Sequence, residues 1–171
     1  MSNNAKKSSP SSITKADVIS NVDPEKTASL VNGIIRLTYH ESILQDTVKA
    51  YVVFSDVGLA IDNKSVLEGL PLIGTEDVRL EFEDNNEEKI RVRMNVNTVS
   101  PIYEDGSKNV TSLELVSEEF LRNGMGEARC RTRENGLISD SIEKIFTDRL
   151  KTEKNLDIEQ TANRYNFIGN G

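Results

Sequence analysis

The chain has 171 residues and a formal net charge of −7, and it is 36% hydrophobic and 29% charged. This length suits one medium domain or a domain plus a fragment, with enough apolar content for a core. An acidic chain without a basic cluster argues against nucleic-acid binding, which depends on Lys and Arg neutralising phosphates, and against docking on anionic membranes. No apolar run is long enough to cross a bilayer. We therefore expect no sequence-specific nucleic-acid binding and no stable membrane insertion.

The first 30 residues are predicted to form a flexible N-terminal tail. Their opening, MSNNAKKSSPSSITKAD, is rich in Ser, Asn and Lys and poor in bulky apolar residues. Such a composition buries too little apolar surface to offset the entropy lost on ordering. The tail either orders on a partner or is a plain flexible terminus, and its composition favours neither.

The chain then changes to a β-rich pattern. Apolar and polar residues alternate through residues 35–40, 48–54 and 111–115, and a period of two is typical of strands whose two faces differ. In the second of these strands both faces are partly apolar, which predicts a central or doubly covered strand. A short helix is expected within residues 63–68. Residues 31–117 are thus predicted to form a meander of about five strands.

The clearest pattern is a hairpin at residues 78–96, VRLEFEDNNEEKIRVRMNV. Both arms alternate strictly, and the turn between them holds only Asp, Asn and Glu, so we predict a half-buried antiparallel sheet with one charged face. That charged face consists of Arg79, Glu81, Glu83, Arg91 and Arg93. Beyond the hairpin, residues 100–107 are predicted to be a loop, because Asp-Gly is a turn signal.

The last third of the chain, residues 118–171, is predicted to be a helical segment that begins a second domain. Ser117 is suited to an N-cap, with acidic residues in the turn that follows. A second helix is expected from an apolar face and from a capping-box pattern of Asp140 with Glu143. Its apolar face comprises Ile138, Ile142, Ile145, Phe146 and Leu150.

The sequence lacks the common motifs of catalytic, metal-binding and nucleotide-binding sites. There is no P-loop, zinc pattern or nucleophile elbow, and nothing brings the single Cys130 near the single His40. Gly124-Met125-Gly126 follows a predicted helix, unlike a dinucleotide-binding motif. Acidic residues are plentiful, namely Glu76, Asp77, Glu81, Glu83, Asp84, Glu87 and Glu88. Such a cluster could bind a cation or act in acid–base catalysis, but a solvated charged face is favoured. We predict no catalytic, cofactor-binding or metal-binding residues, and no enzyme.

Five segments in order carry a family resemblance. They are IIRLTYHESI at 34–43, LPLIGTEDVRLEF at 70–82, LELVSEE at 113–119 followed by Arg122-Asn123, GLISDSI at 136–142, and NFIGN at 166–170. Together they resemble the N-terminal part of the baseplate hub (tail hub) proteins of contractile-tailed phages, which are related in architecture to type VI secretion spikes. The match leaves out residues 1–30, and the chain departs from the family by ending before a second barrel.

The resemblance implies an α+β fold, in which an antiparallel β-barrel of the tail-tube type with a short helix is followed by a small helical segment. It implies a structural subunit of the virion tail baseplate, assembled in the host cytoplasm. Such a subunit self-associates, as a trimer in full-length form, into a ring around the DNA channel, and it contacts the tail tube protein and the central spike protein.

The resemblance also suggests a role for the charged hairpin face. In a ring closed through sheet edges, this face could line the channel or contact a neighbouring subunit, and acidic side chains in a channel would repel DNA. We therefore expect Glu81 and Glu83 to face lumen or solvent, and not to lie buried under the helix at 138–150. The alternative is a non-enzymatic β-rich interaction or adaptor domain of a larger cytoplasmic protein.

Overall fold

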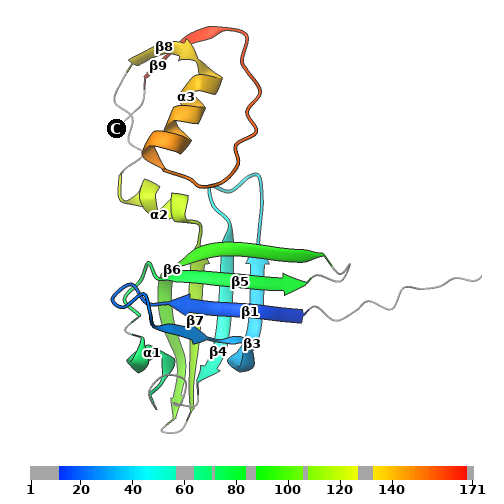
Figure 1. Cartoon of the computed structure of the whole chain (residues 1–171), viewed down its shortest axis with the longest axis vertical. Coiled ribbons are helices and arrows are strands. Elements are labelled where there is room, and N and C mark those ends of the chain that lie inside the picture. Colours follow the sequence, from blue (N-terminus) through cyan, green and yellow to red (C-terminus); the bar gives the residue numbers. More distant parts are fainter. Residues whose placement is uncertain are drawn as a thin grey trace, which may run out of the picture. The chain divides into compact units, whose positions relative to one another are not determined.

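The computed structural model describes residues 12–56, 64–70, 72–83, 88–105, 108–126 and 133–168. The chain forms two compact units, Met1–Ser117 and Glu118–Gly171. The described part of the first unit is a curled antiparallel sheet of seven strands in the order β2-β1-β5-β6-β7-β4-β3, with one short helix (Figure 1). The described part of the second unit holds two helical segments and a two-stranded sheet, β8-β9.

The elements of the first unit are β1 (Ser12–Ile19), β2 (Thr27–Ser29), the 3-10 turn η1 (Val31–Gly33), β3 (Ile34–His40), β4 (Lys49–Asp56), α1 (Val66–Gly69), β5 (Asp77–Glu83), β6 (Lys89–Asp105) and β7 (Lys108–Val116). Those of the second unit are α2 (Glu118–Gly124), β8 (Arg133–Leu137), α3 (Ile138–Lys144), the π-helical turn η2 (Ile145–Arg149) and β9 (Arg164–Ile168).

The long strand β6 belongs to two layers of the sheet. Its first part pairs with β5 as far as Asn95, and its part from Asn95 onward pairs with β7. A register shift between Val96 and Thr98 marks the change of partner, since a bulge bends and twists a strand. Layer 1 is therefore β2-β1-β5 with the start of β6, and layer 2 is the rest of β6 with β7, β4 and β3. In Figure 1, β1 and β5 run across the direction of β4 and β7.

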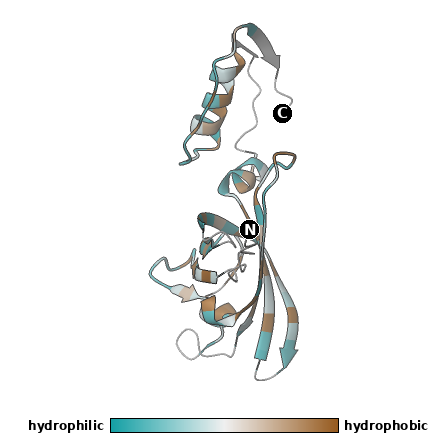
Figure 2. Cartoon of the chain, turned by 90° about the vertical axis from the view of Figure 1, so that its right-hand side faces the viewer, coloured by the Kyte–Doolittle hydropathy of each residue, from teal (hydrophilic) through white to brown (hydrophobic). Residues whose placement is uncertain are grey.

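The core lies between the two layers, because alternation turns one apolar face of each layer inward. Apolar and polar bands follow one another along the long strands in Figure 2. Layer 1 contributes Val78, Leu80 and Met94, and layer 2 contributes Phe54 and Leu115, all of them almost fully buried. Tyr39 of β3 meets Phe82 of β5 with ring centroids 5.5 Å apart. The predicted apolar phases of the strands thus face the core, except at Ile35, which is 59% exposed at a register shift of β3.

The two ends of the sheet are held near each other by the chain itself. β2 ends one side of the sheet and β3 ends the other, yet only residues 30–33 separate them. So short a link spans at most about 18 Å, which forces the sheet to curl. The Leu30 amide donates to the Ala16 carbonyl oxygen at 2.8 Å and ties the link to β1. At Gly33 a Cβ atom would lie 2.4 Å from the Ser55 carbonyl oxygen, so this close approach requires glycine.

The prediction of a flexible tail through residue 30 is wrong for residues 12–30. They form β1 and β2, and β1 pairs with β5 from Ser12 to Ile19. Ala16, Val18, Ala28 and Leu30 are buried in the core. Few apolar residues suffice here because β1 lies between two other strands, whose ladders satisfy its backbone groups.

The predicted five-strand meander is also wrong in its order. All five expected strands form, but β4 pairs with β7 rather than β5, so the chain crosses over between β4 and β5. Residues 100–105, predicted as loop, continue β6 to Asp105. Pro101 is accommodated next to a second register shift, between Pro101 and Tyr103, where the missing N–H breaks no ladder.

The second unit is more mixed than the predicted helical segment. Residues 164–168 pair with β8 as strand β9, and the expected helix is α3 followed by the π-helical turn η2. The capping box is wrong, because α3 begins at Ile138 and Asp140 lies inside its first turn. The amide of Ser139 instead donates to the Thr161 hydroxyl at 3.4 Å.

Candidate functional site

The charged hairpin face lies on the outside of layer 1, away from the core. Arg79, Arg91 and Arg93 are exposed, and Glu81 and Glu83 are partly exposed. Neither glutamate is buried, since their side chains keep 36% and 31% of their accessible surface. These five residues, with Asp77, Lys89 and the β1 residues Lys15 and Asp17, are called the charged ladder below.

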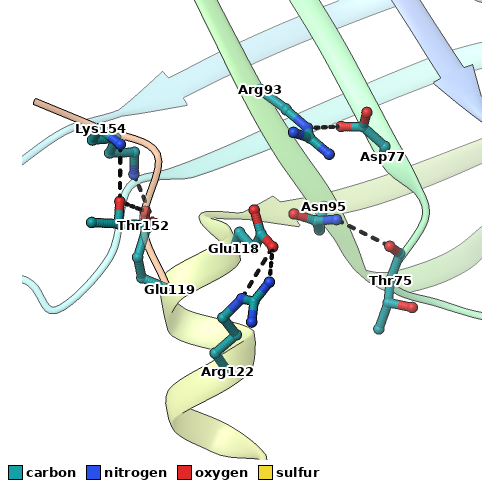
Figure 3. A network of polar contacts seen from close by, with 9 residues as sticks. All are labelled: Thr75, Asp77, Arg93, Asn95, Glu118, Glu119, Arg122, Thr152 and Lys154. Carbon is teal, nitrogen blue, oxygen red and sulfur yellow. Dashed lines mark hydrogen bonds and ion pairs between the residues drawn. The ribbon is translucent and has the colours of Figure 1, made fainter. Parts of the chain in front are cut away.

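The ladder is organised by strand register. Glu81 lies opposite Arg91 and Glu83 opposite Lys89, and their charged atoms are 3.5 and 3.9 Å apart. Asp77 accepts a hydrogen bond from the Arg93 guanidinium at 2.9 Å (Figure 3). Cross-strand pairs of opposite charge stabilise a sheet modestly, and exposed pairs contribute at most about 1 kcal/mol each.

The ladder is not a net acidic surface. Its carboxylates are Asp17, Asp77, Glu81 and Glu83, and each has a cation within 4 Å, so five cations face four carboxylates. Repulsion of DNA by clustered acids therefore finds no basis in this face. The geometry suits a solvated or contacting surface with alternating charge.

The segment at residues 72–82 contains a buried acid, Glu76, which was predicted to belong to the solvated acidic residues. Glu76 is 0% exposed, and its carboxylate accepts hydrogen bonds from the Ile73 amide at 2.7 Å and the Gly74 amide at 3.1 Å. Gly74 and Thr75 both have positive φ, at 104° and 71°. Glu76 thus holds a strained turn closed, which is a structural role.

Two asparagines fix this turn to its neighbours. Asn21 donates to the Gly74 carbonyl oxygen at 3.0 Å and to the Thr75 hydroxyl at 2.9 Å. Asn95 donates to the Thr75 carbonyl oxygen at 3.0 Å, as Figure 3 shows. The structural role of Glu76 has a sequence signal, because Gly74 stands two residues before it and the strand β5 begins directly after it.

The outer face of layer 2 is a second polar surface, which the sequence analysis did not single out. Cross-strand partners share a face, so Thr38, Tyr51, Glu114 and Thr98 form one row of it. The face is rich in hydroxyl groups and nearly neutral. It comprises Arg36, Thr38, His40, Lys49, Tyr51, Val53, Ser55, Thr98, Ser100, Val110, Ser112 and Glu114.

The remaining candidate residues show no catalytic arrangement in the described part of the chain. His40 is exposed at the end of β3, with its ring edge-on to Tyr51 at 5.9 Å. No group of three or more His, Cys, Asp or Glu among the described residues could hold a metal ion. Glu88 is exposed, whereas Asp84, Glu87 and Cys130 lie outside the described residues. Among the described helices, none is both long and apolar enough to pass through a bilayer.

Comparisons with known proteins give a likeness in structure but none in sequence. No protein-family model matches the chain, and no curated protein matches its sequence. Among solved structures it is similar to the E. coli c3393 protein, a component of the type VI secretion system with structural similarity to the T4 bacteriophage tail proteins gp27 and gp5. The TM-score is 0.44 at 13% identity, over 94% of this chain and 36% of that one. The chain thus spans about a third of that protein's length.

Proposed function

We propose that this protein is a structural subunit of a phage tail baseplate hub, which joins copies of itself through sheet edges into a ring around the DNA channel. The proposal is supported by the ordered sequence segments that resemble the hub family. It is also supported by the edges of layer 2, which carry the decisive observation. Contacts with a tail tube and a central spike, a trimeric state in the full-length form, and a place in the virion tail are parts of the same proposal.

Both edges of layer 2 are unpaired within the described residues. β3 pairs only with β4, and β6 beyond Thr98 pairs only with β7. Long unpaired edges invite pairing with another chain, because their N–H and C=O groups have no ladder partner. Layer 2 is therefore suited to extend from one copy into the next.

Each of these edges exposes an isoleucine at a bulge. The register of β3 shifts between Ile34 and Arg36, and that of β6 shifts between Pro101 and Tyr103, which leaves Ile35 and Ile102 outside the ladders. Ile35 is 59% exposed and Ile102 is 58% exposed. Apolar side chains on an open edge favour burial against a partner.

The two isoleucines lie at matching heights across the sheet. Ile34, Phe54, Thr111 and Pro101 are successive cross-strand partners, so one row runs from the β3 edge to the β6 edge. β3 is antiparallel to β6, because three antiparallel steps separate them. Rotation of a copy about a ring axis would thus place β3 antiparallel to the neighbour's β6, and Ile35 near its Ile102.

If the ring closes through the edges of layer 2, one of the two polar faces is favoured as the lining of the channel. A continuous layer 2 would have layer 1 packed on one side and the hydroxyl-rich face on the other. Placing layer 1 at the larger radius, where a ring offers more room, leaves the hydroxyl-rich face toward the channel. The charged ladder, including Arg79, Glu81, Glu83, Arg91 and Arg93, would then be a surface for contacts with neighbouring subunits or tail proteins.

Disulfide trapping tests the seam directly. Ile35→Cys and Ile102→Cys are introduced together into the full-length protein with Cys130→Ser, so that the thiol of Cys130 does not compete. Mild oxidation should give covalent oligomers, because paired edges bring Cα atoms within the 4.4–6.8 Å range that a disulfide needs. Shifting the second cysteine to Pro101 or Tyr103 would define the register.

The matched control combines Ile102→Cys with Val22→Cys, since Val22 is equally solvent-accessible but lies in the β1–β2 connection of layer 1. This pair should remain monomeric on denaturing gels. A full-length protein that stays monomeric in sedimentation and yields no cross-link at any register would overturn the ring and favour the adaptor alternative.

A further inference from the structure

The turn between β3 and β4 presents two aliphatic side chains to solvent. Ile43 is 101% exposed and Leu44 is 91% exposed, so neither is covered by the described residues of the first unit. They occupy the middle of a turn at residues 42–45, closed by the Gln45 amide and the Ser42 carbonyl oxygen at 3.2 Å. Residues 42–45 are called the apolar tip below.

Local turn chemistry does not account for these two residues. The middle positions of turns favour Gly, Asn, Asp, Pro or Ser, which suit the backbone and solvent. Ile and Leu offer no hydrogen bond, and their β-branched or bulky side chains gain nothing there when exposed. Two adjacent aliphatic residues at the outermost point of a connection therefore favour burial against something outside the first unit.

The apolar tip is held in place by the residues around it. The Leu44 amide donates to the Ser42 hydroxyl at 3.2 Å, and the Tyr39 hydroxyl donates to the Glu41 carboxylate at 3.3 Å. Buried Thr47 donates to the Val48 carbonyl oxygen at 3.0 Å and shares a hydrogen bond with the Ser117 hydroxyl at 3.1 Å. A pre-organised tip loses little conformational entropy on binding.

The charges beside the apolar tip define the partner's chemistry. Glu41 and Asp46 flank it, and residues 41–47 contain no Lys or Arg. An anionic membrane surface would repel these carboxylates. A protein pocket with an apolar floor and Lys or Arg at its rim is complementary to the tip in both respects.

We propose that the apolar tip is a docking knob for a protein that stacks on the end of the ring, inserting Ile43 and Leu44 into an apolar socket with a basic rim. This rests on the proposed function, since a ring sets the same tip of every copy around one rim. The β3–β4 turn lies at one end of the layer 2 strands, so the knob would give the assembly a direction along the tail axis.

The test uses the full-length protein with Ile43→Ser and Leu44→Ser, against the separately purified tail tube and spike proteins of the same virus. Binding is measured by biolayer interferometry and ring assembly by sedimentation. The double variant should assemble normally, but its affinity for one of the two proteins should fall about 100-fold or more, as losing two buried aliphatic side chains implies. Ile73→Ser, at an exposed isoleucine of the α1–β5 connection, is the control and should bind normally.

A second pair of variants tests the rim. Glu41→Gln and Asp46→Asn should slow association and flatten its salt dependence, because electrostatic complementarity acts mainly on the on-rate. Glu25→Gln, an exposed acid of the β1–β2 connection, should leave both unchanged.

The outcomes separate the two proposals. Normal rings with unchanged affinity for both proteins would overturn the knob and leave the ring standing. Loss of the ring in the double variant would place the tip in the subunit seam and would also overturn the knob. A wild-type protein that forms no ring and binds neither protein would overturn both.

Discussion

Layers 1 and 2 are built from the same alternating strands, yet their outer surfaces differ. Layer 1 ends in β2, a strand of three residues, and in the first part of β6, which carries Lys89, Arg91 and Arg93. Its outer face is a ladder of paired charges. Layer 2 ends in two long edges, each with an exposed isoleucine at a bulge, and its outer face is nearly neutral. Charge and short edges discourage association, whereas long apolar edges promote it. The same alternation of apolar and polar residues thus gives a solvated surface in layer 1 and edges suited to assembly in layer 2.

The largest effect is expected at the buried acid of layer 1. Glu76→Ala removes the acceptor for the Ile73 and Gly74 amides, and we expect the free energy of unfolding to fall by about 2–4 kcal/mol, since unpaired buried donors are costly. Urea denaturation of the two variants Glu76→Ala and Glu76→Gln measures it. Glu76→Gln keeps an acceptor and should lose less. If Glu76→Ala were as stable as the wild type, the structural role inferred for Glu76 would be wrong.

The next effect concerns the edges of layer 2. Ile102→Asp should weaken self-association about 100-fold, because a carboxylate would have to be desolvated in the seam, while the monomer keeps its stability. Sedimentation velocity over a concentration series reports it. Val22→Asp, a similarly exposed apolar residue of the β1–β2 connection on layer 1, should not alter assembly. If it weakens assembly as much as Ile102→Asp does, the two layers do not differ as we infer.

A smaller effect is expected within the charged ladder. A double-mutant cycle on Glu81 and Arg91 should give a coupling free energy of about 0.2–1 kcal/mol that shrinks at high salt, since both side chains are solvated. Thermal unfolding at low and high ionic strength supplies the four stabilities. A coupling above this range that salt does not screen would indicate that the ladder is desolvated by a partner.

The smallest effect concerns a carboxylate of the second unit. Burial alone would raise the pKa of Glu119, but hydrogen bonds from Lys154 at 2.7 Å and Thr152 at 2.6 Å outweigh it and lower that pKa (Figure 3). A lowered pKa in the folded state means that the contact stabilises the unit above the unfolded pKa of a glutamate. That stabilisation is lost as pH falls through the folded pKa.

Amide hydrogen exchange at Lys154 follows this contact. Its amide donates to the Thr152 hydroxyl at 3.2 Å, so we expect faster exchange, relative to the intrinsic rate, below the folded pKa of Glu119. Glu119→Gln should show that faster exchange at neutral pH and no further change on acidification. A pH response that survives in Glu119→Gln would assign the titration to another group.

Some of the fold was predictable because it depends only on residues that are close together in the sequence. The hairpin of β5 and β6 has unbroken alternation, and so its strands, its apolar face and its exposed charges followed from periodicity alone. β1 was missed because a register shift between Ile13 and Lys15 puts Ile13 out of phase with Ala16 and Val18. Pro101 and two bulges likewise concealed the second half of β6.

The candidate surfaces were only partly predictable. The five hairpin residues of the ladder were identified as a charged face, but Lys15 and Asp17 were assigned to the flexible tail. Glu76 was grouped with solvated acids because its two amide donors are visible only once the turn is folded. The layer 2 edges could not be found from the sequence. A strand is an edge when it pairs on one side only, and this depends on the order of the strands in the sheet.

By itself the sequence determined the local features of this protein: which segments alternate, which face of each is apolar, and where charge accumulates. Only the tertiary structure decided that β4 pairs with β7, that β6 joins two layers, and that Ile35 and Ile102 lie at the two open edges in one row. The physical reason is that periodicity acts between neighbours two residues apart. Strand order depends on pairings between residues that can be 60 or more positions apart, such as Val52 with Leu113, whose stability comes from the assembled core.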